Sequence, residues 1–167
     1  MPIDCSRSNI VLDAAGLFAG VELSHGIFYV TEKVLREVLD RESRMRLELA
    51  QTSGKIVVIA PPREYVLRVI SRSRELGILE ELSEADIEVL ALAEYVRSLC
   101  GSSIIYTDDK LVQDVATSLG IKIQGVKYLE RSRPRKYIYR CRICGFTSRS
   151  PGDCPRCGIP LELEDIR

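Results

Sequence analysis

Two pairs of closely spaced cysteines near the end of the chain constrain its fold more than any other feature. The pairs are Cys141-Arg-Ile-Cys144 and Cys154-Pro-Arg-Cys157, each followed by a glycine and separated from each other by nine residues. Four thiolates at this spacing are typical of a structural site that holds one tetrahedral Zn²⁺ ion. A segment of about 30 residues is too small to fold on an apolar core alone. We therefore predict a zinc ribbon over residues 137–163, whose closed site does no chemistry.

Rubredoxin holds iron with similar cysteine knuckles. Redox chemistry is disfavoured here because the ribbon is appended to a larger domain, lies among arginines and lacks a packed aromatic core. Cys5 and Cys100 stand alone, and the single histidine, His25, offers neither of them an obvious partner for a catalytic dyad. We expect ordinary thiols at these two positions, because a metal site in the cytosol explains the six cysteines better than disulfides do.

Short apolar strands alternate with helices over the first three quarters of the chain. The predicted strands cover residues 9–12, 27–30, 55–60, 103–106 and 121–124. The predicted helices follow Asp13, run from Thr31 to about Thr52 as one helix or a pair, and cover 63–76, 83–99 and 107–120. This alternation indicates right-handed βαβ crossovers and a mainly parallel sheet, so the predicted fold class is α/β. We place this domain at residues 1–127 and a basic linker at 128–136.

The net charge of zero hides an asymmetry between the two ends of the chain. Residues 1–130 carry 15 Lys and Arg against 20 Asp and Glu, whereas residues 131–167 carry 9 against 4. A basic stretch of this kind is typical of a surface that contacts RNA phosphates, although a solvated linker has the same composition. The candidate RNA-binding residues are Arg131, Arg133, Arg135, Lys136, Arg140 and Arg142. The rings of Tyr137, Tyr139 and Phe146 either stack on bases or fill the small core of the ribbon.

The sequence contains no run that approaches the roughly 18 apolar residues that a membrane-spanning helix requires. Its first residues also lack a basic stretch leading into a long apolar segment, which disfavours a secretory signal. We therefore expect a soluble, cytoplasmic protein.

Acidic residues recur where predicted strands end and helices begin. Asp13 closes the first strand, Asp86 opens the most apolar helix, and Asp109 follows the fourth strand with Asp108 beside it. Glu37 lies two turns into the helix after the second strand. Ligands of a parallel sheet gather at this edge, where the strands end. Carboxylates gathered there would repel one another unless a divalent cation compensated them, and hard oxygen ligands select Mg²⁺ or Mn²⁺.

Each of these acids also has a purely structural explanation. The explanations are a capping box for Asp86 with Ser83, an ion pair of Glu37 with Arg41, and a helix N-terminus for Asp108 and Asp109. Asp13 is harder to explain in this way, because Ser or Asn would fill a capping role at the end of a strand equally well. The functional interpretation therefore depends on the whole set.

The acidic segments resemble the four motifs that line the metal pocket of PIN-domain nucleases. The segments are Ile10–Asp13, Thr31–Val38, Leu82–Asp86 and Tyr106–Asp109. The resemblance implies that Asp13, Glu37, Asp86 and Asp109 are catalytic and that Thr107 supports them. Residues 37–43, residues 109–116 and the ribbon extend the resemblance, so that nearly the whole chain is similar to the archaeal branch of the Nob-one family. Members of that family mature the 3′ end of small-subunit ribosomal RNA. Asp114 departs from this pattern, because Asn is expected there.

This resemblance implies hydrolysis of RNA with the help of one or two Mg²⁺ or Mn²⁺ ions, leaving 5′-phosphate and 3′-hydroxyl ends. It implies precursor ribosomal RNA as the partner, together with ribosome assembly factors, and it does not indicate an oligomeric state. Two other functions stay open. The chain is either an RNA-binding assembly factor with an inert acidic set, or a toxin-type PIN nuclease that acts on other RNAs, although an appended ribbon is unusual in such toxins.

Overall fold

A parallel sheet lies at the centre of the larger domain. The computed structural model describes residues 3–20, 26–127 and 133–166. The strands are β1 (Ile10–Leu12), β2 (Phe28–Val30), β3 (Ile56–Val58), β4 (Ile104–Tyr106) and β5 (Lys122–Gln124), in the order β3-β2-β1-β4-β5. Every pairing between them is parallel, as the alternation of strands and helices predicts. β1 is central because Val11 pairs with Tyr29 on one side and with Ile105 on the other, and all three side chains are buried.

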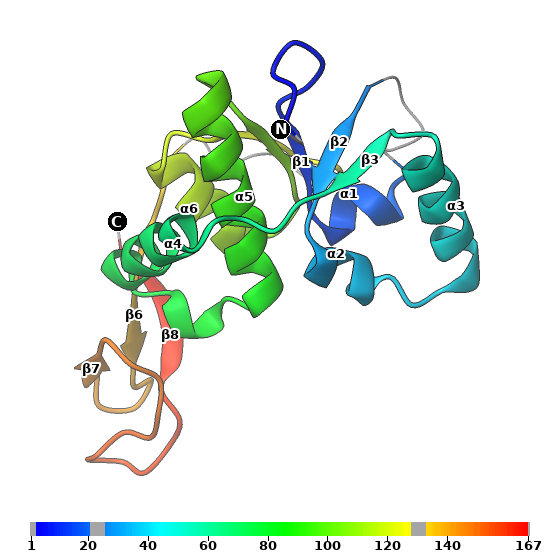
Figure 1. Ribbon diagram of the computed structural model, residues 1–167. Coiled ribbons are helices and arrows are strands. Elements are labelled where there is room, and N and C mark those ends of the chain that lie inside the picture. Colours follow the sequence, from blue (N-terminus) through cyan, green and yellow to red (C-terminus); the bar gives the residue numbers. More distant parts are fainter. Residues whose placement is uncertain (1–2, 21–25, 128–132, 167) are drawn as a thin grey trace.

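Helices cover both faces of this sheet. The helices are α1 (Ala14–Phe18), α2 (Glu32–Glu37), α3 (Arg41–Thr52), α4 (Arg63–Leu76), α5 (Glu84–Cys100) and α6 (Lys110–Ser118), with a 3₁₀ turn, η2 (Leu79–Glu81), before α5. The chain winds from β1 to β3 in one direction and from β4 to β5 in the other. Right-handed crossovers therefore place α1–α3 on one face and α4–α6 on the opposite face (Figure 1). In the part of the chain that the structure describes, no helix is long and apolar enough to cross a membrane.

The local signals in the sequence account for several helix ends. The predicted capping box is present, because the Ser83 hydroxyl accepts from the Asp86 amide at 3.1 Å and the Asp86 carboxylate accepts from the Ser83 amide at 2.8 Å. The helix predicted after Thr31 is a pair, because the chain leaves α2 at Val38 and Asp40 caps α3 through the Ser43 amide at 2.8 Å.

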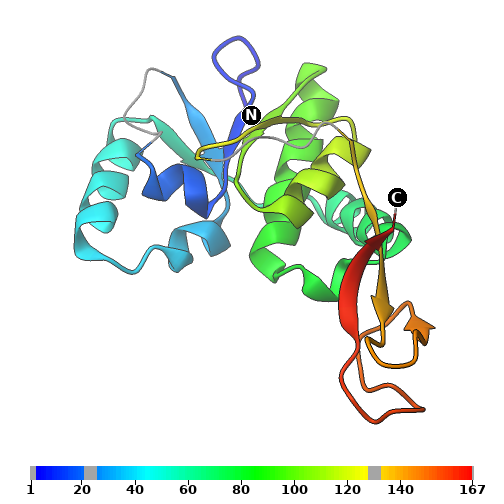
Figure 2. The same cartoon turned by 180° about the vertical axis from the view of Figure 1, so that it is seen from behind.

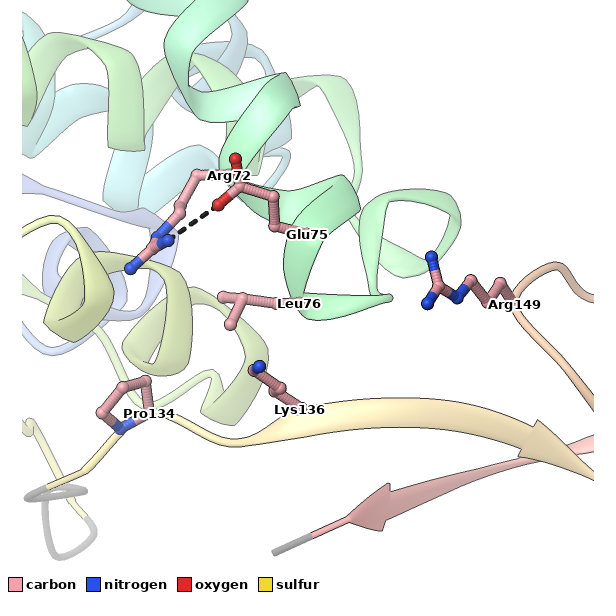
Figure 3. Close-up of a pocket in the computed structure, with 6 residues that line it drawn as sticks. All are labelled: Arg72, Glu75, Leu76, Pro134, Lys136 and Arg149. Atoms are coloured by element: carbon pink, nitrogen blue, oxygen red, sulfur yellow. Dashed lines mark hydrogen bonds and ion pairs between the residues drawn. The ribbon is translucent and has the colours of Figure 1, made fainter.

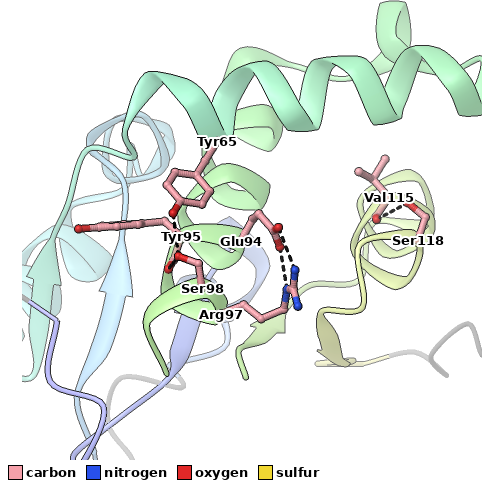
Figure 4. Close-up of polar contacts among 7 residues, drawn as sticks. All are labelled: Tyr65, Glu94, Tyr95, Arg97, Ser98, Val115 and Ser118. Atoms are coloured by element: carbon pink, nitrogen blue, oxygen red, sulfur yellow. Dashed lines mark hydrogen bonds and ion pairs between the residues drawn. The ribbon is translucent and has the colours of Figure 1, made fainter. Parts of the chain in front are cut away.

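Helices α4 and α5 pack through aromatic and polar contacts (Figure 4). The rings of Tyr65 and Tyr95 have their centroids 5.1 Å apart, and the Tyr65 hydroxyl lies 2.8 Å from that of Ser98. Glu94 is buried in α5 and accepts hydrogen bonds from two guanidinium nitrogens of Arg97 at 2.8 and 2.9 Å. The Tyr65 contacts hold α4 against α5, whose first turn contains Asp86 and which packs on β1 and β4, while the Glu94–Arg97 pair lies within α5 itself.

Cys5 and Cys100 form a disulfide, so the expectation of two ordinary thiols was wrong. The bond joins the segment before β1 to the last residue of α5, with the two Cα atoms 5.2 Å apart. Sequence reasoning missed it because 95 positions separate the two cysteines and the folded sheet brings them together. His25, which entered that argument, lies outside the described residues.

The C-terminal ribbon is a small antiparallel sheet. Its strands are β6 (Lys136–Arg140), β7 (Thr147–Ser148) and β8 (Glu162–Ile166), in the order β7-β6-β8. Strand β6 begins at the last residue of the predicted linker, and β8 ends three residues beyond the predicted end of the ribbon at 163. Both views show the ribbon extending away from the parallel sheet at the α4 end of the domain (Figure 1, Figure 2).

Two tyrosines of β6 attach the ribbon to the larger domain. The Tyr137 hydroxyl donates to Asp114 in α6 and the Tyr139 hydroxyl to Glu81 in η2, each at 2.6 Å. At Gly77, which follows α4 with a φ of 79°, a Cβ atom would overlap the carbonyl oxygen of Tyr137. The tyrosines were expected to stack on bases or to fill the ribbon core, and the structure shows in addition that the hydroxyl of each contacts the larger domain.

Candidate active site and cysteine cluster

Asp13 lies where the winding of the sheet reverses, at the carboxyl end of central strand β1 and beside β4. Ligands of open parallel sheets bind at such reversal points. The side chain is only 8% exposed. One carboxylate oxygen accepts a hydrogen bond from the Ala14 amide at 2.7 Å, and the other accepts one from the Thr107 hydroxyl at 2.7 Å. The orientation of Asp13 is therefore fixed from two sides.

Thr107 connects Asp13 with Asp109. Its buried hydroxyl donates to Asp13 and accepts from the Asp109 amide at 3.1 Å. Asp109 caps α6 with one carboxylate oxygen, which accepts from the Leu111 and Val112 amides at 2.7 and 3.2 Å. The first and fourth predicted acidic motifs are thus joined through one hydroxyl, although 94 positions separate Thr107 from Asp13.

Glu37 and Asp86 act on Asp13 through their negative charges. Burial raises the pKa of Asp13 to about 6, its two hydrogen bonds oppose this shift, and the negative charges of Asp86 and Glu37 add to it. Burial, and then the charge of Asp86, also raises the pKa of Glu37. Asp13 is buried, Asp86 is half-buried, and Glu37 and Asp109 are exposed, so the group opens from the sheet edge toward solvent.

The structure also tests the structural explanations of these acids. Asp86 does form the capping box, with one oxygen, and its other oxygen accepts no hydrogen bond within the described residues. Glu37 forms no ion pair with Arg41 in that part of the chain. Asp108 instead accepts from the Val126 and Lys127 amides at 2.8 and 3.1 Å, which ties it to the segment after β5. Asp108 and Asp109 therefore have different surroundings.

The donor chemistry of this acidic group suits a hard divalent cation. All its donors are carboxylate oxygens, and the raised pKa of Asp13 shows that burial and neighbouring charges act on it. Among the described residues, the acids do not form a set as compact as the four cysteines. Mg²⁺ usually keeps several waters and binds one or two carboxylates directly, so it does not require the acids to lie as close together as the cysteines do.

The four cysteines form a much tighter cluster. Their sulfur atoms all lie within 4.8 Å of one another. Backbone amides of Cys144 and Ile143 lower the pKa of Cys141 to about 7, with burial opposing them. Hydrogen bonding with Cys144, followed by burial, raises the pKa of Cys157 to about 12. Neighbouring thiols thus favour ionisation of Cys141 and hinder that of Cys157, and a bound cation would relieve the hindrance.

Glycines close both cysteine knuckles. The Gly145 amide donates to the Cys141 carbonyl at 2.9 Å, and the Gly158 amide donates to the Cys154 carbonyl at 2.8 Å. Both glycines have a positive φ, of 71° and 68°, which a residue with a Cβ atom rarely adopts. The two turns are equivalent and fold the cysteines toward one another, as a tetrahedral S₄ site requires.

The predicted RNA-binding residues have unlike surroundings. Arg135 pairs with Asp165, Arg140 with Glu164 at 2.5 Å, and Arg142 with Glu162 at 3.5 Å, so acids of β8 partly neutralise three of them. Arg133 and Lys136 form no ion pair within the described residues, and Arg131 lies outside those residues. The basic stretch is thus not a uniform cationic surface.

Sequence reasoning missed the residues that join the two regions. Glu81 appears in the sequence only as one of several acids before the capping box, and Asp114 only as a departure from the expected Asn. Burial raises the pKa of Tyr139, so its hydroxyl stays protonated and donates to Glu81. No periodicity or spacing signal identifies such contacts, because each depends on how β6 docks.

Comparisons with known proteins agree with this arrangement. Residues 10–96 match the family described as the PIN domain of ribonuclease. The chain is 40% identical over 160 residues to Endoribonuclease Nob1 of Pyrococcus abyssi, which covers 94% of each protein. It is 37% identical to Ribonuclease VapC3 of Aeropyrum pernix, over 73% of this chain and 88% of that protein. It is also 30% identical to the 20S-pre-rRNA D-site endonuclease nob1 of Schizosaccharomyces pombe, over 52% of this chain and 23% of that protein.

The similarity to the Pyrococcus abyssi protein runs through both the parallel-sheet domain and the cysteine-bearing ribbon, since it covers nearly all of each chain. The reversal point of the sheet also carries Asp13, which Thr107 joins to Asp109. The chain therefore belongs to the Nob1 family of PIN-domain endoribonucleases.

Proposed function

We propose that this endoribonuclease cleaves the precursor of small-subunit ribosomal RNA near its 3′ end, in the cytoplasm, with the help of a divalent cation. The proposal is carried by a single observation, the link among the four acids. The negative charges of Asp86 and Glu37 act on the buried Asp13, and Asp86 also acts on Glu37. Thr107 joins Asp109 to Asp13 through its hydroxyl. The choice of substrate is supported by the fission yeast relative, whose name states that it acts on a 20S pre-rRNA.

In this proposal, Asp13, Glu37, Asp86 and Asp109 hold Mg²⁺ or Mn²⁺. The ion supplies a Lewis acid that activates water and offsets charge on the leaving 3′ oxygen. Thr107 and the Ala14 amide orient the Asp13 carboxylate. Asp86 and Asp109 each use one oxygen to cap a helix, so their positions are set by the backbone while the second oxygen faces no hydrogen-bond donor within the described residues.

The four cysteines hold Zn²⁺ in this proposal, and the zinc folds the ribbon without taking part in the reaction. A closed S₄ site has no open coordination position. The ribbon then presents its basic residues to the RNA, and the affinity falls as salt displaces these phosphate contacts. Ribosome assembly factors would be further partners on the pre-ribosome.

Cleavage of a precursor RNA that spans the small-subunit 3′ end, with and without Mn²⁺, tests this function. Asp13→Asn keeps the shape of the side chain and removes its charge, and we expect it to lower the cleavage rate at least about 10³-fold. Asp108→Asn is the matched control, because an amide oxygen still accepts from the Val126 and Lys127 amides. Equal cleavage by the parent protein and Asp13→Asn would end the enzymatic proposal and favour an inert assembly factor.

Similarity to Ribonuclease VapC3 supports a second candidate, a nuclease that acts on other RNAs. The two candidates differ in selectivity. If the precursor is the substrate, an excess of unrelated structured RNA should slow its cleavage only slightly. Equal cleavage of the precursor and unrelated RNA at the same Mn²⁺ concentration would favour the second candidate.

A further inference from the structure

A cleft lies at the junction of the two regions and shares no lining residue with the acidic group. It has a volume of about 450 Å³ and is lined by Arg72, Glu75 and Leu76 of α4, Pro134 and Lys136 at the start of β6, and Arg149 after β7. Leu76 and Lys136 lie across from each other, and Arg149 approaches from the ribbon side (Figure 3). Residues of both regions therefore form one concave surface.

Three of the six lining side chains are cationic and one is anionic. The anionic one, Glu75, already accepts from Arg72 at 2.7 Å. Arg72 is held further by Ser118, whose hydroxyl and carbonyl oxygens lie 3.1 and 3.2 Å from two of its guanidinium nitrogens. The cation on this wall is therefore fixed in place before any ligand arrives.

Lys136 and Arg149 differ from the neighbouring basic residues of the ribbon. Arg135, Arg140 and Arg142 are each paired with an acid of β8. Lys136 and Arg149 are exposed, and within the described ranges neither of them has an ion pair. These two unpaired positive charges of the ribbon thus line the cleft.

We propose that this cleft binds the phosphate backbone of the RNA substrate, as a contact site separate from the acidic group. The proposal rests on the proposed function, because that function supplies RNA as the ligand. Arg72 is partly neutralised by Glu75 but held in a fixed geometry, and together with the exposed cations of Lys136 and Arg149 it suits phosphate oxygens. Phosphate contacts set the register of a nucleic acid without reading its sequence. A strand held here contacts α4 and the ribbon at once, which fixes the RNA relative to both regions.

The test measures RNA affinity over a range of salt concentrations, without added Mg²⁺ or Mn²⁺ so that the RNA stays intact. The test variant is Lys136→Gln/Arg149→Gln, and both side chains are exposed, so the fold should be unaffected. Each lost phosphate contact should lower the slope of log K against log salt by about 0.7 for single-stranded RNA. At 0.1 M salt this slope corresponds to a loss of affinity of roughly fivefold per contact.

The matched control is Arg7→Gln/Arg63→Gln, which removes the same charge from exposed positions away from the cleft, in the N-terminal segment and at the opposite end of α4. Its salt slope should equal that of the parent protein. An unchanged slope in the test variant, or an equal loss in the control, would overturn the cleft proposal and leave the cleavage proposal standing. If the parent protein itself binds no precursor RNA, the proposed function fails as well.

A free phosphate ion is the other ligand whose chemistry would suit this cleft. Inorganic phosphate, added at an ionic strength matched with chloride, should displace RNA from the parent protein no better than chloride does. Selective displacement by millimolar phosphate that is lost in Lys136→Gln/Arg149→Gln would assign the cleft to a small anion and contradict a backbone site.

Discussion

The parallel-sheet domain and the ribbon differ in what holds each of them together. The sheet is buried between two layers of helices, with side chains such as Val11, Tyr29 and Ile105 fully inaccessible. In the ribbon, β8 alternates between exposed and half-buried residues, and the buried side chains include Cys141 and Cys154 themselves. The larger domain thus folds around apolar side chains, whereas the ribbon depends on its cysteines.

This difference separates the roles of the two candidate ion sites. The acidic group lies at the edge of a scaffold that apolar burial already stabilises, so its charges are available for chemistry. The cysteine cluster is the centre of its own region, so an ion bound there would contribute folding free energy. Cysteine also has two roles, because Cys5 and Cys100 cross-link the larger domain while the other four form the cluster.

Cys154→Ser should have the largest effect, confined to the ribbon. Structural zinc in small modules contributes an apparent binding free energy of about 10–16 kcal/mol, and removing one ligand forfeits most of it. Amide resonances of residues 136–166 should collapse to positions typical of unfolded chains, while those of β1–β5 stay in place. If the sheet resonances collapse as well, the two regions are not independent in the way described here.

Cys100→Ser is the reciprocal change, confined to the larger domain. In the chain-entropy account, losing a cross-link between residues 95 positions apart lowers the free energy of unfolding by about 4.7 kcal/mol. Chemical denaturation of the oxidised protein should show this loss, and the zinc content should stay at one ion per chain. An unchanged free energy of unfolding would show that the disulfide does not stabilise the domain.

Gly77→Ala should cost more than Gly54→Ala and should act on the junction. Both glycines have a positive φ, of 79° and 71°, so each substitution costs about 1–2 kcal/mol in backbone strain. At Gly54 a Cβ atom would meet nothing within 4 Å, whereas at Gly77 it overlaps the Tyr137 carbonyl oxygen. That overlap should add about 1–3 kcal/mol and speed hydrogen exchange in β6. Equal losses of stability in the two variants would contradict the docking described here.

Raising the pH should slightly destabilise the larger domain when no divalent cation is present. The pKa of Asp13 is about 6 in the folded protein against an ordinary value of 3.8, so folding favours the protonated acid. Its contribution to stability is present below pH 4 and is lost as the pH rises to about 6. We expect a loss of about 1–2 kcal/mol, below the upper limit of roughly 3 kcal/mol that such a shift implies.

The Asp13→Asn variant, measured alongside by thermal unfolding from pH 4 to 7, should lack this component. Mn²⁺ should reverse the trend in the parent protein, because the ion binds the ionised carboxylate and stabilises it increasingly as the pH rises toward 6. A parent protein with the same pH profile as Asp13→Asn would show that Asp13 is not perturbed.

The sequence predicted the elements of the fold better than their contacts. Strand and helix positions follow from apolar periodicity and caps, as at Ser83 and Asp86, because these signals are local. The link from Asp13 through Thr107 to Asp109 came from a resemblance and not from spacing, since it depends on β1 lying beside β4.

The junction could not be predicted, for the same reason. Tyr139 and Glu81 are 58 positions apart, and their contact depends on where a small separate sheet docks. The pairing of Arg140 with Glu164 likewise requires the register of β6 and β8, which no local pattern in the sequence specifies.

The central claim is that acids from separate elements hold one divalent cation, and Mn²⁺ binding followed by electron paramagnetic resonance tests it most directly. The parent protein and Asp108→Asn should bind Mn²⁺ with the same affinity, whereas Asp13→Asn and Asp109→Asn should each bind at least about tenfold more weakly. Asp108 and Asp109 are adjacent in sequence but differ in contacts, so this pair separates the role of position from that of charge. Unchanged affinity in Asp13→Asn, or equal losses in Asp108→Asn and Asp109→Asn, would contradict the account.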